Sequence, residues 1–255
     1  MKPKLTAGMI VLYCALAASH ALAQVSYSIT DLGVPPGAVS TEAHDLNIGG
    51  EVVGAIDLTN GYPHGFLYRA GVMQDLGTLG GEDSLASRIN QSGQIAGYSQ
   101  VTNDTVYRAF LYSGGVMQDL GTLGNGSSFG AAISPSGMVV GNADVVQFSY
   151  AHAFLYSNGV MQDLGALGGD GHTSFATGIN DSGQVVGGSL FTPPNNTEQA
   201  FLYANGTMSD LGTLGGSDSV AYDINEQGEV VGNASTASGD SHAFLYKGGV
   251  MGDLG

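Results

Sequence analysis

The sequence has almost no cysteine: a single residue, Cys14, lies near the N-terminus. The 241 residues that follow Cys14 contain none. Disulfide bonds and thiolate chemistry are therefore excluded from that part of the chain. Its stability must come from burial and hydrogen bonding alone.

Basic residues are also scarce, with 6 Lys and Arg against 22 Asp and Glu. Two of the six, Lys2 and Lys4, belong to an N-terminal segment with the pattern of an export signal, and without them the net charge is −18. Nucleic-acid binding needs Lys and Arg to displace counterions from phosphates, so this chain excludes it. Anionic membrane surfaces are disfavoured for the same reason. Cations, neutral glycans and basic proteins remain as partners.

Long apolar runs are missing as well. The longest, Leu5–Ala18, follows two lysines and precedes Ala21-Leu22-Ala23, which supplies small residues for cleavage before Gln24. A transmembrane helix needs about 20 apolar residues, so residues 1–23 indicate a secretory signal peptide and the mature chain has no predicted membrane span. An uncleaved N-terminal anchor is the alternative interpretation.

No window shows the apolar periodicity of an amphipathic helix. Instead, a unit of about 44 residues recurs five times, with Phe of an Ala-Phe-Leu-Tyr motif and Asp of an Asp-Leu-Gly motif at fixed places. The 42 glycines follow the repeat, which indicates tight turns in a folded domain. The region 24–255 is therefore predicted to be one repeat domain, with units at about 34–77, 78–121, 122–165, 166–212 and 213–255.

Each unit reads as four short strands. Ile-Asn-x-x-Gly between two apolar runs predicts one hairpin, and Ser113-Gly114-Gly115 in the second unit predicts another. Phe110 and Tyr112 should point to one face of the third strand and Leu111 to the other, so both faces are apolar. These features predict an all-β fold, a β-propeller of five complete four-stranded blades. A β-solenoid is the weaker alternative, because its coils are usually shorter.

An extra copy of the fourth strand is predicted at residues 27–33, before the first unit. Such a strand commonly closes a propeller by pairing into the last blade, which removes exposed edges. The fifth unit already has its own fourth strand, however. Five complete units and one additional strand lead to the hypothesis that Gly255 is a truncated end and that the natural chain continues into a sixth blade.

The motifs resemble one known family. His152-Ala153-Phe154 and His242-Ala243-Phe244 combine with Ile-Asn-x-x-Gly-x-Val-Val-Gly and Asp-Leu-Gly-Thr-Leu-Gly-Gly. Over residues 27–255 this pattern is similar to the HAF-repeat family of extracellular bacterial proteins. The resemblance implies export from a bacterium to the periplasm, the cell surface or the medium. It implies no activity, substrate or catalytic residue.

Most repeated side chains are predicted to be scaffold. His64, His152 and His242 should bond neighbouring turns, since equivalent positions in different blades are too far apart to share a zinc ion. The Asp of each Asp-Leu-Gly motif should accept backbone N–H bonds in the turn that follows. The repeated tyrosines should pack between blades rather than stack on sugars.

Candidate binding residues are therefore sought where the repeats differ, because variable loops on a rigid scaffold often carry function. Six aromatic residues in or beside the variable stretches are the predicted ligand contacts: Tyr62, Tyr98, Tyr107, Phe148, Tyr150 and Phe191. No cofactor is predicted, but the Gly-rich connectors between blades, read as solvated turns, offer oxygen ligands suited to calcium. The calcium candidates are Asp83, Asp170 and Asp218.

No catalytic residue is predicted. Gly126-Ser127-Ser128-Phe129-Gly130 matches the form of a nucleophile elbow, but no helix follows it as that motif requires. Acidic residues are expected to sit singly, one blade apart. The sequence thus predicts an exported, non-enzymatic β-propeller that binds a glycan or protein. A carbohydrate-active enzyme with an active site across blades, or a purely structural surface protein, is the alternative.

Overall fold

The structure is a computed structural model that describes residues 28–255 apart from 103–104, 147–149, 170 and 191–196. The chain divides into two compact units, Met1–Asp31 and Leu32–Gly255. The described residues of the first unit contain no strand, and all the sheets belong to the second. The predicted signal peptide lies outside the described residues.

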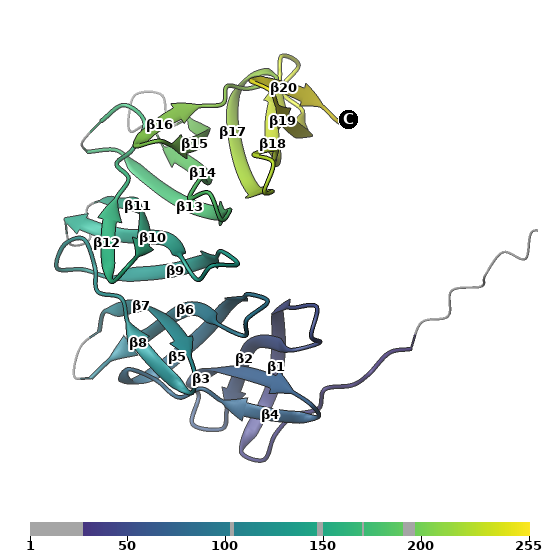
Figure 1. Ribbon diagram of the computed structural model, residues 1–255, viewed down its shortest axis with the longest axis vertical. Helices are drawn as coiled ribbons and strands as arrows, with labels where there is room; N and C mark the ends of the chain where they lie inside the picture. The colour runs from purple at the N-terminus through teal and green to yellow at the C-terminus, as the bar shows by residue number, and fades with distance from the viewer. Residues whose placement is uncertain (1–27, 103–104, 147–149, 170, 191–196) are drawn as a thin grey trace, which may run out of the picture. The chain divides into compact units, whose positions relative to one another are not determined.

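The second unit consists of five four-stranded antiparallel sheets, each ordered as its strands follow in the chain (Figure 1). The first strands are β1 (Ala38–Leu46), β5 (Gly80–Ile89), β9 (Ser128–Ile133), β13 (Thr173–Ile179) and β17 (Gly215–Ile224). The second strands are β2 (Val52–Leu58), β6 (Ile95–Val101), β10 (Val139–Val146), β14 (Val185–Leu190) and β18 (Val230–Thr236). The third strands are β3 (Pro63–Arg69), β7 (Tyr107–Ser113), β11 (Tyr150–Ser157), β15 (Glu198–Ala204) and β19 (Ser241–Lys247). The fourth strands are β4 (Val72–Asp75), β8 (Val116–Asp119), β12 (Val160–Asp163), β16 (Thr207–Asp210) and β20 (Val250–Asp253). We number the sheets 1 to 5 in chain order.

The predicted hairpins are confirmed, and the asparagine of each Ile-Asn pair explains them. Asn90 Oδ1 accepts the backbone N–H of Gln94 at 3.0 Å, and Gly93 N donates to the Asn90 carbonyl at 3.1 Å. Gly93 has φ +75°, a conformation that glycine adopts without steric cost. The side-chain NH₂ of Asn90 also donates to the carbonyl of Ser134 in sheet 3, at 3.1 Å. One side chain therefore shapes a turn and ties two sheets together.

Apolar layers between consecutive sheets form the core. Phe110 and Tyr112 pack with Val53 and Leu67 of sheet 1, whereas Leu111 packs against residues of sheet 3. The five repeated phenylalanines are all at most 1% exposed. The prediction that both faces of the third strand are apolar and pack against neighbouring sheets is therefore confirmed.

A repeated serine carries the polar contact between consecutive sheets. Ser84 Oγ on β5 accepts the backbone N–H of Gly65 on β3 at 2.9 Å and donates to the Gly77 carbonyl at 2.6 Å. The equivalent residues that bridge the later sheets in the same way are Ser128, Ser174 and Ser219. The sheets pack in chain order, and each of the four junctions between them repeats the serine contact.

The repeated tyrosines follow the same pattern. The hydroxyl groups of Tyr112, Tyr156 and Tyr203 each accept a hydrogen bond from a glutamine of the preceding sheet, at 2.8–2.9 Å. These three rings are 6–7% exposed. The prediction that they pack between sheets is confirmed.

Two local predictions are wrong. The extra strand expected at 27–33 is absent, since residues 28–33 contain no strand and residue 27 lies outside the described part. A fourth strand in this fold pairs only with a third strand, and this segment is not paired with one. The connectors Gly80–Ser84 and Gly215–Ser219, expected to be solvated turns, are instead the beginnings of β5 and β17. Gly81 permits this because a Cβ there would lie 2.7 Å from the backbone of Gln100.

Candidate functional site

The first strand of each sheet carries a β-bulge at the same repeat position. The ladder with the second strand shifts by one residue there, and the five bulged residues are His44, Ser87, Ala131, Thr177 and Tyr222. A bulge bends its strand and re-aims neighbouring side chains, which is why bulges are frequent next to functional sites. All five bulges lie just before the Ile-Asn turn or its equivalent.

Three bulged side chains bond to the next sheet. His44 Nδ1 lies 2.8 Å from the Ala86 carbonyl, so this nitrogen carries the proton. Ser87 Oγ donates to the Gly130 carbonyl at 2.9 Å. Thr177 Oγ1 donates to the Ala221 carbonyl at 2.8 Å. These bonds fix the spacing of the first strands and hold the residues after each bulge in place.

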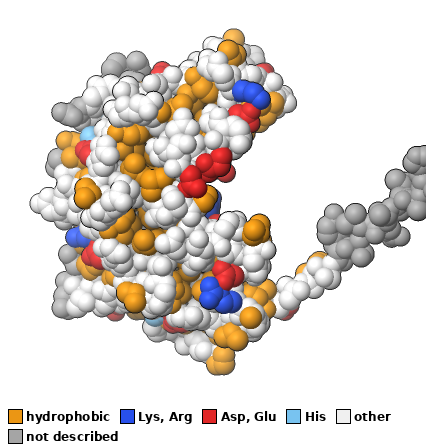
Figure 2. All heavy atoms as spheres, in the orientation of Figure 1, with side chains coloured by type: hydrophobic (Ala, Val, Ile, Leu, Met, Phe, Trp, Pro, Cys, Tyr) orange, Lys and Arg blue, Asp and Glu red, His pale blue; other side chains and the backbone are white. Residues whose placement is uncertain are grey.

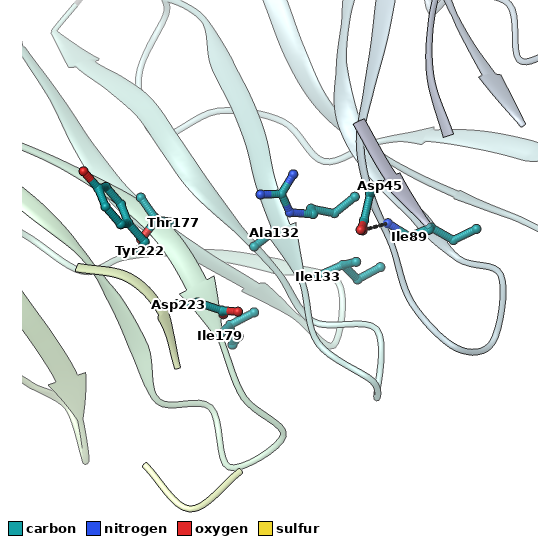
Figure 3. Close-up of a pocket in the computed structure, with 9 residues that line it drawn as sticks. Asp45, Ile89, Ala132, Ile133, Thr177, Ile179, Tyr222 and Asp223 are labelled. Carbon is teal, nitrogen blue, oxygen red and sulfur yellow. Dashed lines mark hydrogen bonds between the residues drawn. The ribbon is translucent and has the colours of Figure 1, made fainter. Parts of the chain in front are cut away.

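The residues that follow the bulges form a pocket of about 350 Å³ together with two of the bulged ones (Figure 3). We call it the central pocket. It is lined by Asp45, Arg88, Ile89, Ala132, Ile133, Thr177, Ile179, Tyr222 and Asp223. Every one of the five sheets contributes to it through its first strand. Its volume lies at the small end of the range for ligand pockets.

Two carboxylates lie on opposite sides of the central pocket. Asp45 and Asp223 are separated by Ala132 and Ile133 in the close-up (Figure 3). Asp45 Oδ2 accepts the backbone N–H of Ile89 at 2.9 Å, a bond from one sheet to the next. Gly178 makes room for Asp223, because a Cβ at this glycine would lie 3.0 Å from Asp223 Oδ1. The missing side chain in one sheet thus admits a carboxylate from the next.

Arg88 is the basic residue of the central pocket. Its side chain is exposed, and Nη1 donates to the carbonyl of Ser87 at 3.1 Å. Among the described residues it is in no ion pair, whereas Arg69 pairs with Glu51 and Lys247 with Glu229. Figure 2 shows how sparse charge is on one face of the molecule, where the acidic and basic side chains form a few small groups. Of the two arginines without an ion pair in the described part of the chain, Arg88 and Arg108, only Arg88 lines the central pocket.

The structure also brings together several residues that the sequence indicated as binding candidates. Tyr98 and Tyr107 have ring centroids 5.7 Å apart, and Phe129 of sheet 3 lies 5.1 Å from Tyr98. Tyr107 donates its hydroxyl to Asp83 Oδ2 at 2.9 Å. We call these four residues the aromatic cluster. The calcium candidate Asp83 thus lies beside two of the predicted aromatic contacts, which belong to strands β6 and β7, and Phe129 adds a ring that the sequence did not indicate.

One oxygen of the aromatic cluster has no partner. Asp83 Oδ1 is buried without a hydrogen bond among the described residues. At the equivalent junctions the backbone N–H of Tyr107 donates to Ser127 Oγ at 3.1 Å, and that of Glu198 to Asp218 Oδ1 at 3.0 Å. In sheet 1 the donor position is Pro63, which has no N–H. Pro63 therefore removes the backbone N–H that would otherwise be available to Asp83 Oδ1.

This environment disfavours ionisation of the nearby phenols. Burial raises the pKa of Tyr98, and the Asp83 charge adds to the effect. Burial also raises the pKa of Tyr107, together with its hydrogen bond to Asp83. The pKa of exposed Tyr62 is raised chiefly by a hydrogen bond with Glu82. All three tyrosines therefore stay neutral donors at ordinary pH.

The remaining predicted residues are dispersed. The Tyr150 ring lies 5.5 Å from that of His152, within sheet 3. Phe148, Phe191 and Asp170 lie outside the described residues. In the described part of the chain, no three His, Cys, Asp or Glu side chains gather in a metal-binding group.

The prediction that acidic residues sit singly is wrong for Glu198 and Asp218. Both line a pocket of about 160 Å³ with Asn233, Ser235 and Ser241. Burial raises the pKa of Glu198, and the charge of Asp218 raises it further. Sequence spacing concealed this pair because the residues belong to different sheets.

The repeated histidines and aspartates form scaffold contacts. His64, His152 and His242 each place Nδ1 2.9 Å from the Asp-Leu-Gly carboxylate of their own sheet. Each such carboxylate also accepts the N–H of the glycine two residues later, at 2.7–2.9 Å. The predicted turn contact of the aspartates is confirmed. These bonds close the end of the third and fourth strands.

The central pocket was not predicted from the sequence, although the sequence contains a signal for it. The two residues before each Ile-Asn turn or its equivalent are His-Asp, Ser-Arg, Ala-Ala, Thr-Gly and Tyr-Asp in the successive repeats. Such variation directly beside a nearly invariant motif distinguishes these positions from the repeated scaffold residues. Only the structure shows that these residues, placed by the bulges, meet in one pocket.

Comparison with known proteins supports the fold class. No family model matches the sequence, and no curated protein matches it either. The β-propeller domain of the Trilobed protease from Pyrococcus furiosus is similar in structure, with a TM-score of 0.55 and 10% identity over 86% of this chain and 70% of that one. TolB from Acinetobacter baumannii gives a TM-score of 0.50 and 12% identity over 80% of this chain, which spans 52% of the TolB chain.

These similarities define the class: the chain has a β-propeller fold built from four-stranded sheets. At such low identity they define the fold alone. In the part of the chain that the structure describes, no helix is long and apolar enough to cross a membrane.

Proposed function

We propose that this protein is an exported, non-catalytic binding propeller whose ligand enters the central pocket. The proposal rests mainly on where in the structure the residues that differ between the five repeats are found. Repeated residues such as Ser84 and Asn90 are committed to contacts between sheets. Six of the nine residues that line the pocket differ from repeat to repeat, among them Asp45, Arg88 and Asp223, and the other three are repeated isoleucines. Varied side chains converging on one cavity are what a specific ligand site requires.

The exposed aromatic loops form a second part of this proposal. Tyr62 stands in the loop between β2 and β3, on the same side as Glu82. An aromatic ring beside a carboxylate suits a glycan, whose apolar face stacks and whose hydroxyls donate, or a protein surface. The six predicted aromatic contacts remain candidates for that role.

Export is proposed from the first 23 residues and from the resemblance to the HAF-repeat family. The positively charged N-terminal region, the short apolar run and Ala21-Leu22-Ala23 are consistent with cleavage of a signal peptide before Gln24. The expected location is the periplasm, the cell surface or the medium. Mass spectrometry of the protein recovered from an exporting bacterium should give an N-terminus at Gln24, and an intact Met1 would contradict cleavage.

Methyl NMR tests the binding proposal. Ile89, Ile133 and Ile179 line the central pocket, whereas Ile56 and Ile95 lie elsewhere in the core and act as internal controls. With isoleucine methyl groups labelled, a panel of glycans and short peptides should include a ligand that shifts the pocket signals and spares the controls. The proposal fails if no member of the panel moves the pocket signals.

A specific observation also favours a second candidate, a carbohydrate-active enzyme. Glu198 and Asp218 come from different sheets and share one pocket, where the pKa of Glu198 is raised. A carboxyl group with a raised pKa can act as the general acid of glycoside hydrolysis when a second carboxyl group lies near it. Turnover of polysaccharide that is lost in Glu198→Gln would establish this candidate. Absence of turnover with all tested polysaccharides would leave the binding function.

A further inference from the structure

We infer that the central pocket binds the carboxyl-terminal residue of a peptide, with an apolar side chain and a free α-carboxylate. This inference rests on the proposed function and names the ligand class of the same site. It is drawn from the charge pattern of the pocket, the apolar residues between the charged groups and the size of the pocket. A protein C-terminus and a short free peptide share this chemistry.

Arg88 is the group that selects a carboxylate. A guanidinium has five N–H donors in a rigid fork, and the bond to the Ser87 carbonyl uses one of them. The other basic residues of sheets 1 to 5 are engaged elsewhere: two are in ion pairs, and Arg108 donates to the Gly126 and Tyr107 carbonyls. A carboxylate fits the free fork with two parallel charge-assisted bonds.

The two aspartates exclude a polyanion. The pocket carries Asp45 and Asp223 with one arginine, and the whole chain has a net charge of −16. A ligand with several negative groups would therefore be repelled. A peptide end instead has one carboxylate, and its backbone N–H groups are donors for the aspartate oxygens.

Apolar residues lie between the charged groups, although polar atoms make up most of the exposed surface of the pocket. These apolar residues are Ile89, Ile133, Ile179 and Ala132. Contact with these residues removes apolar surface of the ligand from water, which favours a residue such as leucine at the end of the peptide. The volume of about 350 Å³ accommodates a chain end more readily than a folded segment.

The test uses an N-acetylated hexapeptide that ends in leucine and has no other charge. Its affinity is measured by calorimetry, and its site by the isoleucine methyl signals. We expect the free acid to bind and to shift Ile89, Ile133 and Ile179, and the C-terminal amide to bind about tenfold more weakly or worse. The affinity of N-acetyl-leucine is measured in parallel. Comparison with the hexapeptide shows whether the terminal residue alone is enough for binding or whether the preceding residues are also needed.

Matched variants locate the recognition. Arg88→Gln should lower affinity for the free acid about tenfold or more and leave the amide unaffected, and Arg88→Lys should be intermediate. Arg108→Gln removes the same charge outside the pocket and should keep wild-type affinity. Because Arg88 is exposed, its variants are expected to fold, which circular dichroism checks.

The outcomes separate the inference from the proposed function. Equal binding of acid and amide, or equal losses in Arg88→Gln and Arg108→Gln, would overturn carboxylate recognition. If another ligand of the panel still moves the pocket methyl signals, the binding function stands and only the ligand class is wrong. If no ligand moves them, the binding function fails with it.

Discussion

Replacement of Ser84 by alanine should show how much of the stability comes from the polar contact between two sheets. Ser84 is 1% exposed, and its hydroxyl bonds to two backbone groups at once. It accepts the N–H of Gly65, a buried residue of sheet 1, at 2.9 Å, and donates to the Gly77 carbonyl at 2.6 Å. Alanine removes both bonds and adds no clash.

The expected loss follows from the burial of the two partners. Leaving a buried N–H without an acceptor costs about 1–3 kcal/mol, and losing a bond whose partner water can reach costs about 0.5–1.5 kcal/mol. Gly65 belongs to the first case, and half-buried Gly77 to the second. Together they predict that Ser84→Ala lowers the free energy of unfolding by about 2–4 kcal/mol.

Urea unfolding followed by circular dichroism measures the change, with the slope of the transition checked for constancy. Thr41→Val is the matched control, because Thr41 holds the equivalent position in sheet 1. There the hydroxyl donates only to the Gly33 carbonyl, at 3.2 Å in an exposed setting. The control should cost about 1 kcal/mol or less. Equal losses in the two variants would refute the reasoning that the contact between sheets is responsible.

Three further predictions use other parts of the fold. Glu198→Gln should raise stability at pH 7, because the folded-state pKa of Glu198 lies above its ordinary value and its charged form therefore weakens the fold. Below about pH 4 the carboxyl group is protonated in both states, so the gain in stability should vanish there. Thermal unfolding at a series of pH values measures this. Val186→Ala should lower the free energy of unfolding in urea by about 2–3 kcal/mol, and Val231→Ala at the same repeat position by about 1 kcal/mol or less. The reason is that Val186 is 0% and Val231 43% exposed. Similar losses in the two variants would count against burial as the cause. Tyr107→Phe removes a hydroxyl donor from the buried carboxylate of the aromatic cluster, so a loss of about 1–3 kcal/mol is expected in thermal unfolding, and no loss would show that water replaces the hydroxyl.

The contrast between Val186 and Val231 shows where sequence reasoning stops. Both residues stand in the same Val-Val-Gly motif and are alike in sequence. Their burial differs because sheet 5 covers Val186, whereas no further sheet among the described residues packs on Val231. A repeat pattern describes the average environment of a position, and the ends of the array depart from it.

The candidate sites show a related limit. Tyr98, Tyr107 and Asp83 were identifiable one by one, since each departs from the repeat or stands in a connector. Their grouping was not, because Phe129 reaches them from the next sheet and Pro63 removes a donor from the preceding one. Contacts of this kind depend on how strands of different sheets face each other, which spacing along the chain does not contain.

The sequence by itself determined the strands, their hairpins, the stacking of similar sheets and the scaffold role of the repeated side chains. It could do so because alternation of apolar residues and turn chemistry are local, and each unit repeats them. Only the tertiary structure decided that the varied residues after the five bulges meet in one pocket, and that Glu198 lies beside Asp218. Those juxtapositions join residues far apart in the chain, where each bulge re-aims its strand and each sheet is placed by its neighbours.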